Sequence, residues 1–173
     1  MVELIQDNVR CLQQGIDLLG DMSAEEYTRP LPQCFNSTIG GHMRHNIDHY
    51  FSFVKGHTED IIDYDARLRD SQVETDPAVA IAQMKELSEA LGKIPADMLE
   101  REVKVIMDSG SDAIHGETAR STLKRELQFL LSHTVHHYAL IAVICQLRGI
   151  QPKAGFGVAP STLRYRGSSS CAQ

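Results

Sequence analysis

Residues 121–149, STLKRELQFLLSHTVHHYALIAVICQLRG, decide the fold class of this chain of 173 residues. Ser121 or Thr122 is a suitable N-cap, and Arg148-Gly149 provides the cation and the glycine that commonly close a helix. Between these signals, apolar residues recur at helical spacing. We therefore expect one long helix over about residues 122–148.

Three shorter amphipathic helices are predicted upstream of it. Apolar residues recur at helical spacing over residues 3–20, and Ser37 is a good N-cap for a second helix that runs to about Lys55. Asp76-Pro77 is a strong helix start, and the helix that follows spans about residues 77–92. Four helices of this kind indicate an all-α protein, a four-helix bundle.

A short β-hairpin is expected directly before the last helix. Residues 101–107 alternate charged and apolar side chains, residues 108–111 have the composition of a turn, and residues 112–119 provide a return strand. An isolated hairpin is only marginally stable, so this one must pack against a helix.

The whole chain, residues 1–173, is expected to form a single domain. Residues 21–36 and 56–76 are predicted as loops, the second with room for a short helical turn, and residues 150–173 as a C-terminal tail rich in Gly, Pro and Ser. Gly40-Gly41 would weaken the first turn of a helix, so we interpret the pair as a point of close helix approach or of backbone access to a ligand.

The composition is that of a soluble globular protein, with 42% hydrophobic and 23% charged residues. A net charge of −6 without a basic patch argues against a nucleic-acid partner. The N-terminus lacks a signal-peptide pattern, and the longest apolar stretch, Tyr138 to Leu147, is too short to span a bilayer. We expect a cytoplasmic protein with no membrane partner and reduced cysteines, with Cys145 in the core and Cys171 exposed.

Six of the eight histidines fall in two short windows of the predicted helices: His42, His45 and His49, then His133, His136 and His137. At about 100° per residue, the first three lie within an arc of about 60°, and His133 and His137 are about 40° apart. Helical neighbours one turn apart have Cβ atoms about 5–6 Å apart, so both rings of the second pair can turn toward one metal ion. The first window can supply a third ligand. Exposed or hydrogen-bonded histidines are the alternative interpretation.

Three imidazoles with open coordination positions match a catalytic type of metal site. Neutral imidazole suits zinc, nickel, iron or copper, and a water bound to such an ion becomes acidic and nucleophilic near neutral pH. Asp48 can orient a ligand imidazole through its second ring nitrogen, or can lie solvated on the helix flank. Glu126 is expected as a first-turn charge, and His136 as an exposed or supporting residue.

Structural rather than catalytic roles are expected for several other polar and aromatic residues. Arg44 and Arg148 are expected to be solvated rather than to bind an anionic substrate. Phe51, Phe53 and Phe129 are expected in the core. The sequence contains no G-x-S-x-G motif, no G-x-G-x-x-G motif and no Walker loop, which argues against nucleotide-dependent classes.

Together, the stretches STIGGHMRHNIDHY (37–50), STLKRELQFLLSHTVHHYALIAV (121–143) and GFGVAPSTLRYR (155–166) resemble a subgroup of the DinB/YfiT-like superfamily. The specific parts are GHMRHNIDHY and HTVHH, and the likeness covers nearly the whole chain. The resemblance implies a four-helix bundle with a divalent metal ion, zinc, nickel or iron, held by three histidines. It places the ligands at His45, His133 and His137.

His42 and His49 are additional to the family pattern, and either is an alternative ligand from the first window. His49, one turn beyond His45, can replace or supplement it. The resemblance implies a thiol-dependent S-transferase or a metal-dependent hydrolase, with a small-molecule substrate and a low-molecular-weight thiol as partner. Homodimers are common in the family. Asp48 and His49 are the candidates for catalytic proton transfer.

Two other interpretations compete with this one. The protein can be a metal-binding or small-molecule-binding bundle without catalytic activity, because the sequence offers no general base beyond Asp48 and the additional histidines. It can also be a purely structural bundle with incidental histidines.

Overall fold

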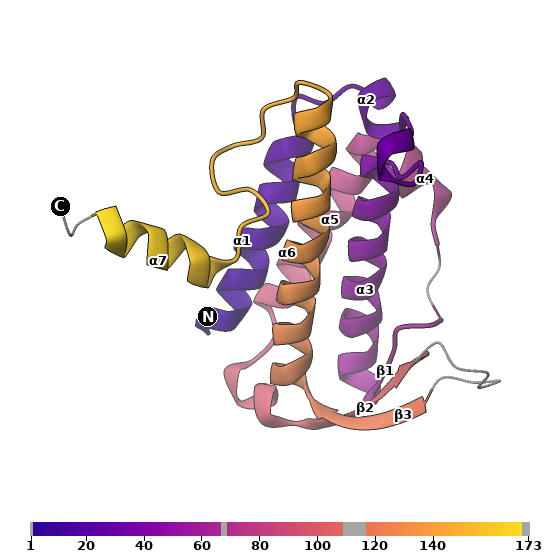
Figure 1. Cartoon of the computed structure of the whole chain (residues 1–173). Helices are drawn as coiled ribbons and strands as arrows, with labels where there is room; N and C mark the ends of the chain where they lie inside the picture. The colour runs from indigo at the N-terminus through magenta and orange to yellow at the C-terminus, as the bar shows by residue number, and fades with distance from the viewer. Residues whose placement is uncertain (1, 67–68, 109–116, 171–173) are drawn as a thin grey trace.

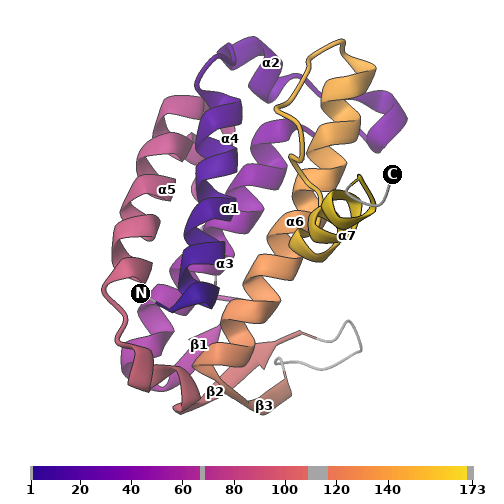
Figure 2. The ribbon, with the colours of Figure 1, turned by 90° about the vertical axis from the view of Figure 1, so that its left-hand side faces the viewer.

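The structure is a computed structural model that describes residues 2–66, 69–108 and 117–170. It is mostly helical. Four long helices run side by side, as Figures 1 and 2 show from two directions: α1 (Glu3–Leu19), α3 (Ile39–Glu59), α5 (Pro77–Gly92) and α6 (Leu123–Leu147). α1 packs against α5 and α6, and α3 packs against the same two helices.

The ends of the long helices follow the capping chemistry of the sequence. Thr122 accepts a hydrogen bond from the Arg125 amide at 3.2 Å, and Asp76 accepts one from the Ala78 amide at 2.8 Å. The second predicted helix begins one residue later than expected, because Thr38 rather than Ser37 is its N-cap. This helix, α3, also extends past Lys55, to Glu59.

Three segments that were predicted as loops or tail contain further helices. The short helical turn expected within residues 56–76 is present, whereas the predictions for residues 21–36 and 150–173 included no helix and were wrong in that respect. Each added helix is short or polar, so its apolar periodicity is too weak to be recognised. They are α2 (Ala24–Thr28) and the 3₁₀ turn Pro32–Cys34, then α4 (Ser71–Thr75), and finally α7 (Pro160–Ser170) in the tail. A further 3₁₀ turn, Ala96–Glu100, precedes the sheet.

A small sheet lies at one end of the helices (Figure 1). The predicted hairpin is present as β2 (Glu102–Met107), paired antiparallel with β3 (Glu117–Thr122), and a third strand that was not predicted, β1 (Ile61–Asp63), runs parallel to β2. The predicted turn and the start of the return strand lie largely in residues 109–116, outside the described residues.

Two glycines mark places where elements approach each other closely. A Cβ atom on Gly15 would lie 2.2 Å from the hydroxyl of Tyr138, so α1 can meet α6 there only through a residue without a side chain. A Cβ atom on Gly40 would lie 2.0 Å from the carbonyl oxygen of Glu74. The close approach expected at Gly40-Gly41 is therefore confirmed for Gly40, which lets α4 sit against the first turn of α3.

By length and composition, α6 is apolar enough to cross a membrane, with a mean hydropathy of 1.3 over its most apolar window. Helices in the core of a bundle pass the same test, and α6 contacts both α1 and α3 along the bundle. Its buried residues include Cys145, as expected. Cys171 lies outside the described residues.

Candidate metal centre

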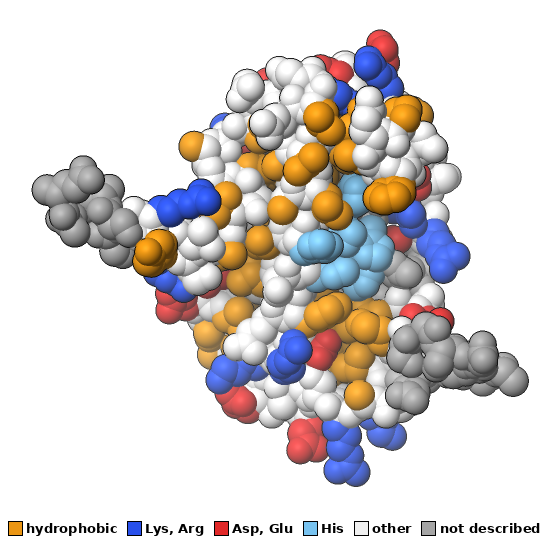
Figure 3. All heavy atoms as spheres, in the orientation of Figure 1, with side chains coloured by type: hydrophobic (Ala, Val, Ile, Leu, Met, Phe, Trp, Pro, Cys, Tyr) orange, Lys and Arg blue, Asp and Glu red, His pale blue; other side chains and the backbone are white. Residues whose placement is uncertain are grey.

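Histidine side chains gather on one face of the molecule, along the seam between α3 and α6 (Figures 1 and 3). Four of their rings contact one another in a closed loop, which we call the histidine square: His45, His49, His133 and His137. Successive ring centroids around it are 4.4, 4.7, 4.6 and 4.5 Å apart. Each helix contributes two rings, one turn apart, as the spacing predicted.

The ring nitrogens within the square are close enough to share one ion. The Nε2 atoms of His45 and His133 are 2.8 Å apart, and one ligand atom from each of His45, His49 and His133 lies within 4.8 Å of the others. The Nδ1–H of His49 donates to the carbonyl oxygen of His45 at 2.7 Å, so Nε2 is the ring nitrogen that this residue can offer to an ion. Three neutral imidazole nitrogens at this spacing fit zinc, nickel or iron(II).

His42 extends the cluster outward from the square. Its Nδ1 lies 2.9 Å from the Nδ1 of His137, and both rings line an open hollow of about 340 Å³. Burial lowers the pKa of His42, and burial with the neighbouring histidines lowers the pKa of His137 to about 3. Both rings are therefore neutral near pH 7, the form that can bind a metal ion or accept a hydrogen bond.

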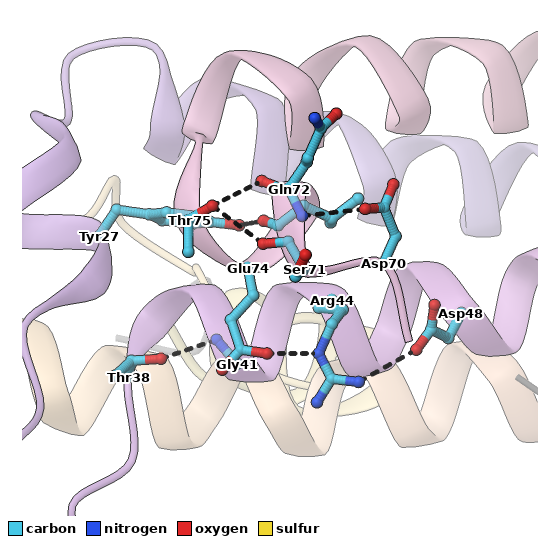
Figure 4. Close-up of polar contacts among 11 residues, drawn as sticks. Tyr27, Thr38, Gly41, Arg44, Asp48, Asp70, Ser71, Gln72, Glu74 and Thr75 are labelled. Atoms are coloured by element: carbon cyan, nitrogen blue, oxygen red, sulfur yellow. Dashed lines mark hydrogen bonds and ion pairs between the residues drawn. The ribbon is translucent and has the colours of Figure 1, made fainter. Parts of the chain in front are cut away.

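The rim of the hollow is polar. It is formed by the first turn of α3 and the residues before it, together with Arg44 and Glu74. Arg44 joins two carboxylates across this rim: its Nε lies 2.8 Å from Glu74, and its guanidinium contacts Asp48 at 3.3 Å (Figure 4). Arg44 is therefore an ion-paired residue at the opening, and not the solvated side chain that was expected.

Asp48 is buried but lies apart from the hollow. It lines a second pocket of about 250 Å³ beside Phe51, Lys55 and Asp70. Asp48 forms an ion pair with Arg44 and is not one of the four residues of the histidine square. The catalytic role predicted for Asp48 and His49 stays a prediction.

Two aromatic rings close the inner side of the square. Tyr64 stacks on His49 with centroids 5.3 Å apart, and Phe129 stacks on His133 at the same distance. Tyr64 and Phe129 also meet each other at 5.4 Å. Phe129, expected simply as core, thus belongs to the wall of the site, and Tyr64 was not singled out because it follows a strand that the sequence did not reveal.

The structure brings together the three predicted ligands His45, His133 and His137, together with the alternatives His49 and His42. The choice among them stays a prediction. His136 is exposed, as one of its two assignments expected, and stands edge-on to His137.

Other arginine, phenylalanine and histidine side chains lie outside the square. Arg148 does not bind at the site, because its guanidinium donates to the backbone carbonyl oxygens of Glu26 and Arg29 and so ties α6 to α2. Phe53 is buried as expected, and His57 stacks on it. His115 lies outside the described residues.

Comparisons with known proteins agree with this architecture. The sequence profile of the DinB superfamily matches residues 9–141. A DinB-like protein from Bacillus subtilis has a similar fold, with a TM-score of 0.62 over 87% of this chain and 94% of that chain at 13% identity, a likeness of fold alone. FK506-binding protein 5 from Rhizopus delemar is 32% identical over 110 residues, which is 61% of this chain but 27% of that protein's length. Since the profile spans well over half of the sequence, the chain belongs to the DinB superfamily.

Proposed function

We propose that the histidine square binds one divalent metal ion, zinc, nickel or iron, and that the protein is a metal-dependent enzyme acting on a small molecule. The observation that carries the proposal is the convergence of His45, His49 and His133, with one ligand atom of each within 4.8 Å of the others. Such closeness among imidazoles from two helices is what a shared ion requires. Bundle cores commonly hold metals in this way, between side chains on facing helices.

His45 and His133 approach each other across the square, with their Nε2 atoms 2.8 Å apart, and we propose both as ligands. The distances favour His49 as the third ligand, because its ligand atom lies within 4.8 Å of those of His45 and His133. The family resemblance favours His137 instead. The Nδ1 of His137 lies 2.9 Å from the Nδ1 of His42, and both residues line the hollow.

A divalent ion held by neutral histidines keeps its full charge and lowers the pKa of a bound water or thiol, which is the chemistry of a hydrolase or of a thiol S-transferase. The chain supplies the surroundings for that chemistry. The hollow of about 340 Å³ has room for a small molecule, and His42 and His137 offer ring nitrogens at its wall. Tyr64 and Phe129 stack against His49 and His133.

One observation favours a second candidate, a metal-binding protein without catalytic activity. Among the described residues that line the hollow, Glu74 is the carboxylate, and it is ion-paired with Arg44. A general base would then have to be a histidine.

The proposal of a metal-dependent enzyme also includes a cytoplasmic location, a low-molecular-weight thiol as partner and a homodimer. Size-exclusion chromatography with light scattering tests the homodimer.

The experiment that tests the function uses protein loaded with zinc, nickel or iron and freed of excess metal. The protein is incubated with an electrophile, with and without a small thiol, and in parallel with a panel of amides and esters. Metal-dependent conjugation that is lost in His133→Ala supports the transferase, and metal-dependent hydrolysis without thiol supports the hydrolase. The matched control is His136→Ala, an exposed histidine on the same helix. Metal binding without turnover across the panels favours the second candidate.

A further inference from the structure

A buried carboxylate stands behind the histidine square without touching it. Glu126 lies in the first turn of α6 and is 6% exposed. Its two oxygens accept separate hydrogen bonds, one from the hydroxyl of Tyr64 at 3.0 Å and one from the hydroxyl of Ser121 at 2.5 Å. The N-terminal end of a helix favours a negative charge, which helps to keep a carboxylate at this buried position.

Tyr64 connects this carboxylate to the site. It is 1% exposed, and it is fixed at three points. Its amide donates to the carbonyl oxygen of Ile106, its hydroxyl donates to Glu126, and its ring stacks on His49 with an interplanar angle of 24°. Burial and the neighbouring carboxylate raise the pKa of the Tyr64 hydroxyl, so the hydroxyl remains a donor.

His49 is consequently held in two ways. Its Nδ1–H is bound to the backbone of α3, and the Tyr64 ring covers a face of its imidazole. Rotation of the His49 ring about its Cβ–Cγ bond would break the hydrogen bond and the stacking together. A ligand whose ring is fixed before the ion arrives pays less orientational entropy on binding, which is how residues that support ligands raise metal affinity.

From this chain of contacts we infer that Tyr64, held by Glu126, is a positioning residue that fixes the ring of His49 in the orientation needed to coordinate the ion. The inference rests on the proposed function, because fixing the ring of His49 raises metal affinity only where His49 is a metal ligand. Its structural content, the immobilisation of His49 by the Glu126–Tyr64 pair, is independent of any ion.

The test begins with metal-free protein, in which ¹H–¹⁵N spectra report the ring of each histidine. Tyr64→Phe keeps the aromatic ring but removes the bond to Glu126, and it should move and broaden the signals of His49 while those of His57 stay unchanged. Glu126→Gln keeps an acceptor for the Tyr64 hydroxyl, so the His49 signals should stay as they are in the wild-type protein. The matched control is Tyr27→Phe, which removes another buried hydroxyl, one that donates to the carbonyl oxygen of Val73 at 2.7 Å.

The second readout is the affinity for Co²⁺, measured by its d–d absorption in competition with a chelator. Tyr64→Phe should weaken binding about tenfold, whereas Tyr27→Phe and Glu126→Gln should leave it within about twofold. Unchanged His49 signals in Tyr64→Phe, or equal changes in Tyr27→Phe, would overturn the inference. Wild-type protein that binds no metal would instead overturn the proposed function, while the metal-free spectra still decide whether Tyr64 positions His49.

Discussion

Two helix pairs of the molecule, α1 with α5 and α3 with α6, differ in what their buried residues can do. Along α1 and α5, the buried side chains are mainly apolar, as with Leu12, Leu19, Leu87 and Leu91. Along α3 and α6, the helices meet through a cluster of imidazoles, with a buried glutamate at one end. Both pairs of helices bury apolar side chains, so both contribute folding energy. The difference is that the α3–α6 seam also holds polar groups, whose burial costs free energy and is offset by mutual contacts or by a bound ion.

The largest expected effect comes from breaking the apolar packing along α1 and α5. Leu87→Ala should lower the free energy of unfolding by about 3 kcal/mol, because it removes buried methyl groups and leaves a cavity. Metal content per folded chain should not change. Urea denaturation of the metal-free protein measures the first quantity and elemental analysis the second.

Leu140→Ala is the matched control for that variant, since Leu140 is 39% exposed on α6 and should cost less than about 1 kcal/mol. Equal losses from both leucines would contradict the prediction that the burial of Leu87 stabilises the fold.

Metal removal should have the next largest effect, and it should act on stability without unfolding the chain. At a free metal concentration of about 100 times Kd, binding stabilises the folded state by about 2.7 kcal/mol. After chelation we expect the helical circular dichroism to persist at 25 °C and the thermal midpoint to fall. Collapse of the helical signal would show that the α3–α6 seam needs the ion in order to fold.

Alkaline pH tests the burial of a thiol on α1. Burial raises the pKa of the Cys11 thiol, on α1, to about 12. The unfolded thiol titrates near about 8.5, so this contribution to stability is complete below that pH and is lost as the pH rises toward the folded value, by up to about 1.4 kcal/mol per unit. Cys11→Ala should flatten the fall in unfolding free energy between about pH 9 and 11; a slope equal to the wild type would contradict this prediction.

The sequence predicted most of what depends on neighbours along the chain. The starts of α5 and α6 followed from Asp76 and Thr122, because capping involves residues within one turn. Histidines one turn apart on each helix predicted a shared face for the same reason. These local rules account for the long helices and for the composition of the site.

Contacts between distant segments were not predictable in this way. The parallel pairing of β1 with β2 involves a strand of three residues, too short to show a period, and it is this pairing that brings Tyr64 beside His49. Glu126 was expected as a first-turn charge, and it is one, but its burial depends on a hydroxyl from 62 positions away. The choice of the third metal ligand likewise depends on how α3 and α6 pack together, which rules for neighbours along the chain do not predict.

The smallest expected effect concerns Asp48, which lies beside the histidine square but is bound to Arg44. Asp48→Asn should change the affinity for Zn²⁺ by less than about threefold, while weakening the Arg44 contact should cost about 1 kcal/mol of stability. Competition titration and urea denaturation measure the two effects. A loss of affinity comparable to that of His133→Ala would place Asp48 at the metal after all.

The most direct test of the metal site is the zinc content of purified, zinc-loaded protein after dialysis. The account predicts about one ion per chain in the wild type and less than about one tenth of an ion in the double variant His45→Ala/His133→Ala. The control double variant His57→Ala/His136→Ala removes two histidines outside the square and should keep the full ion. Equal zinc content in the two double variants would contradict the claim that the α3–α6 seam is a metal centre.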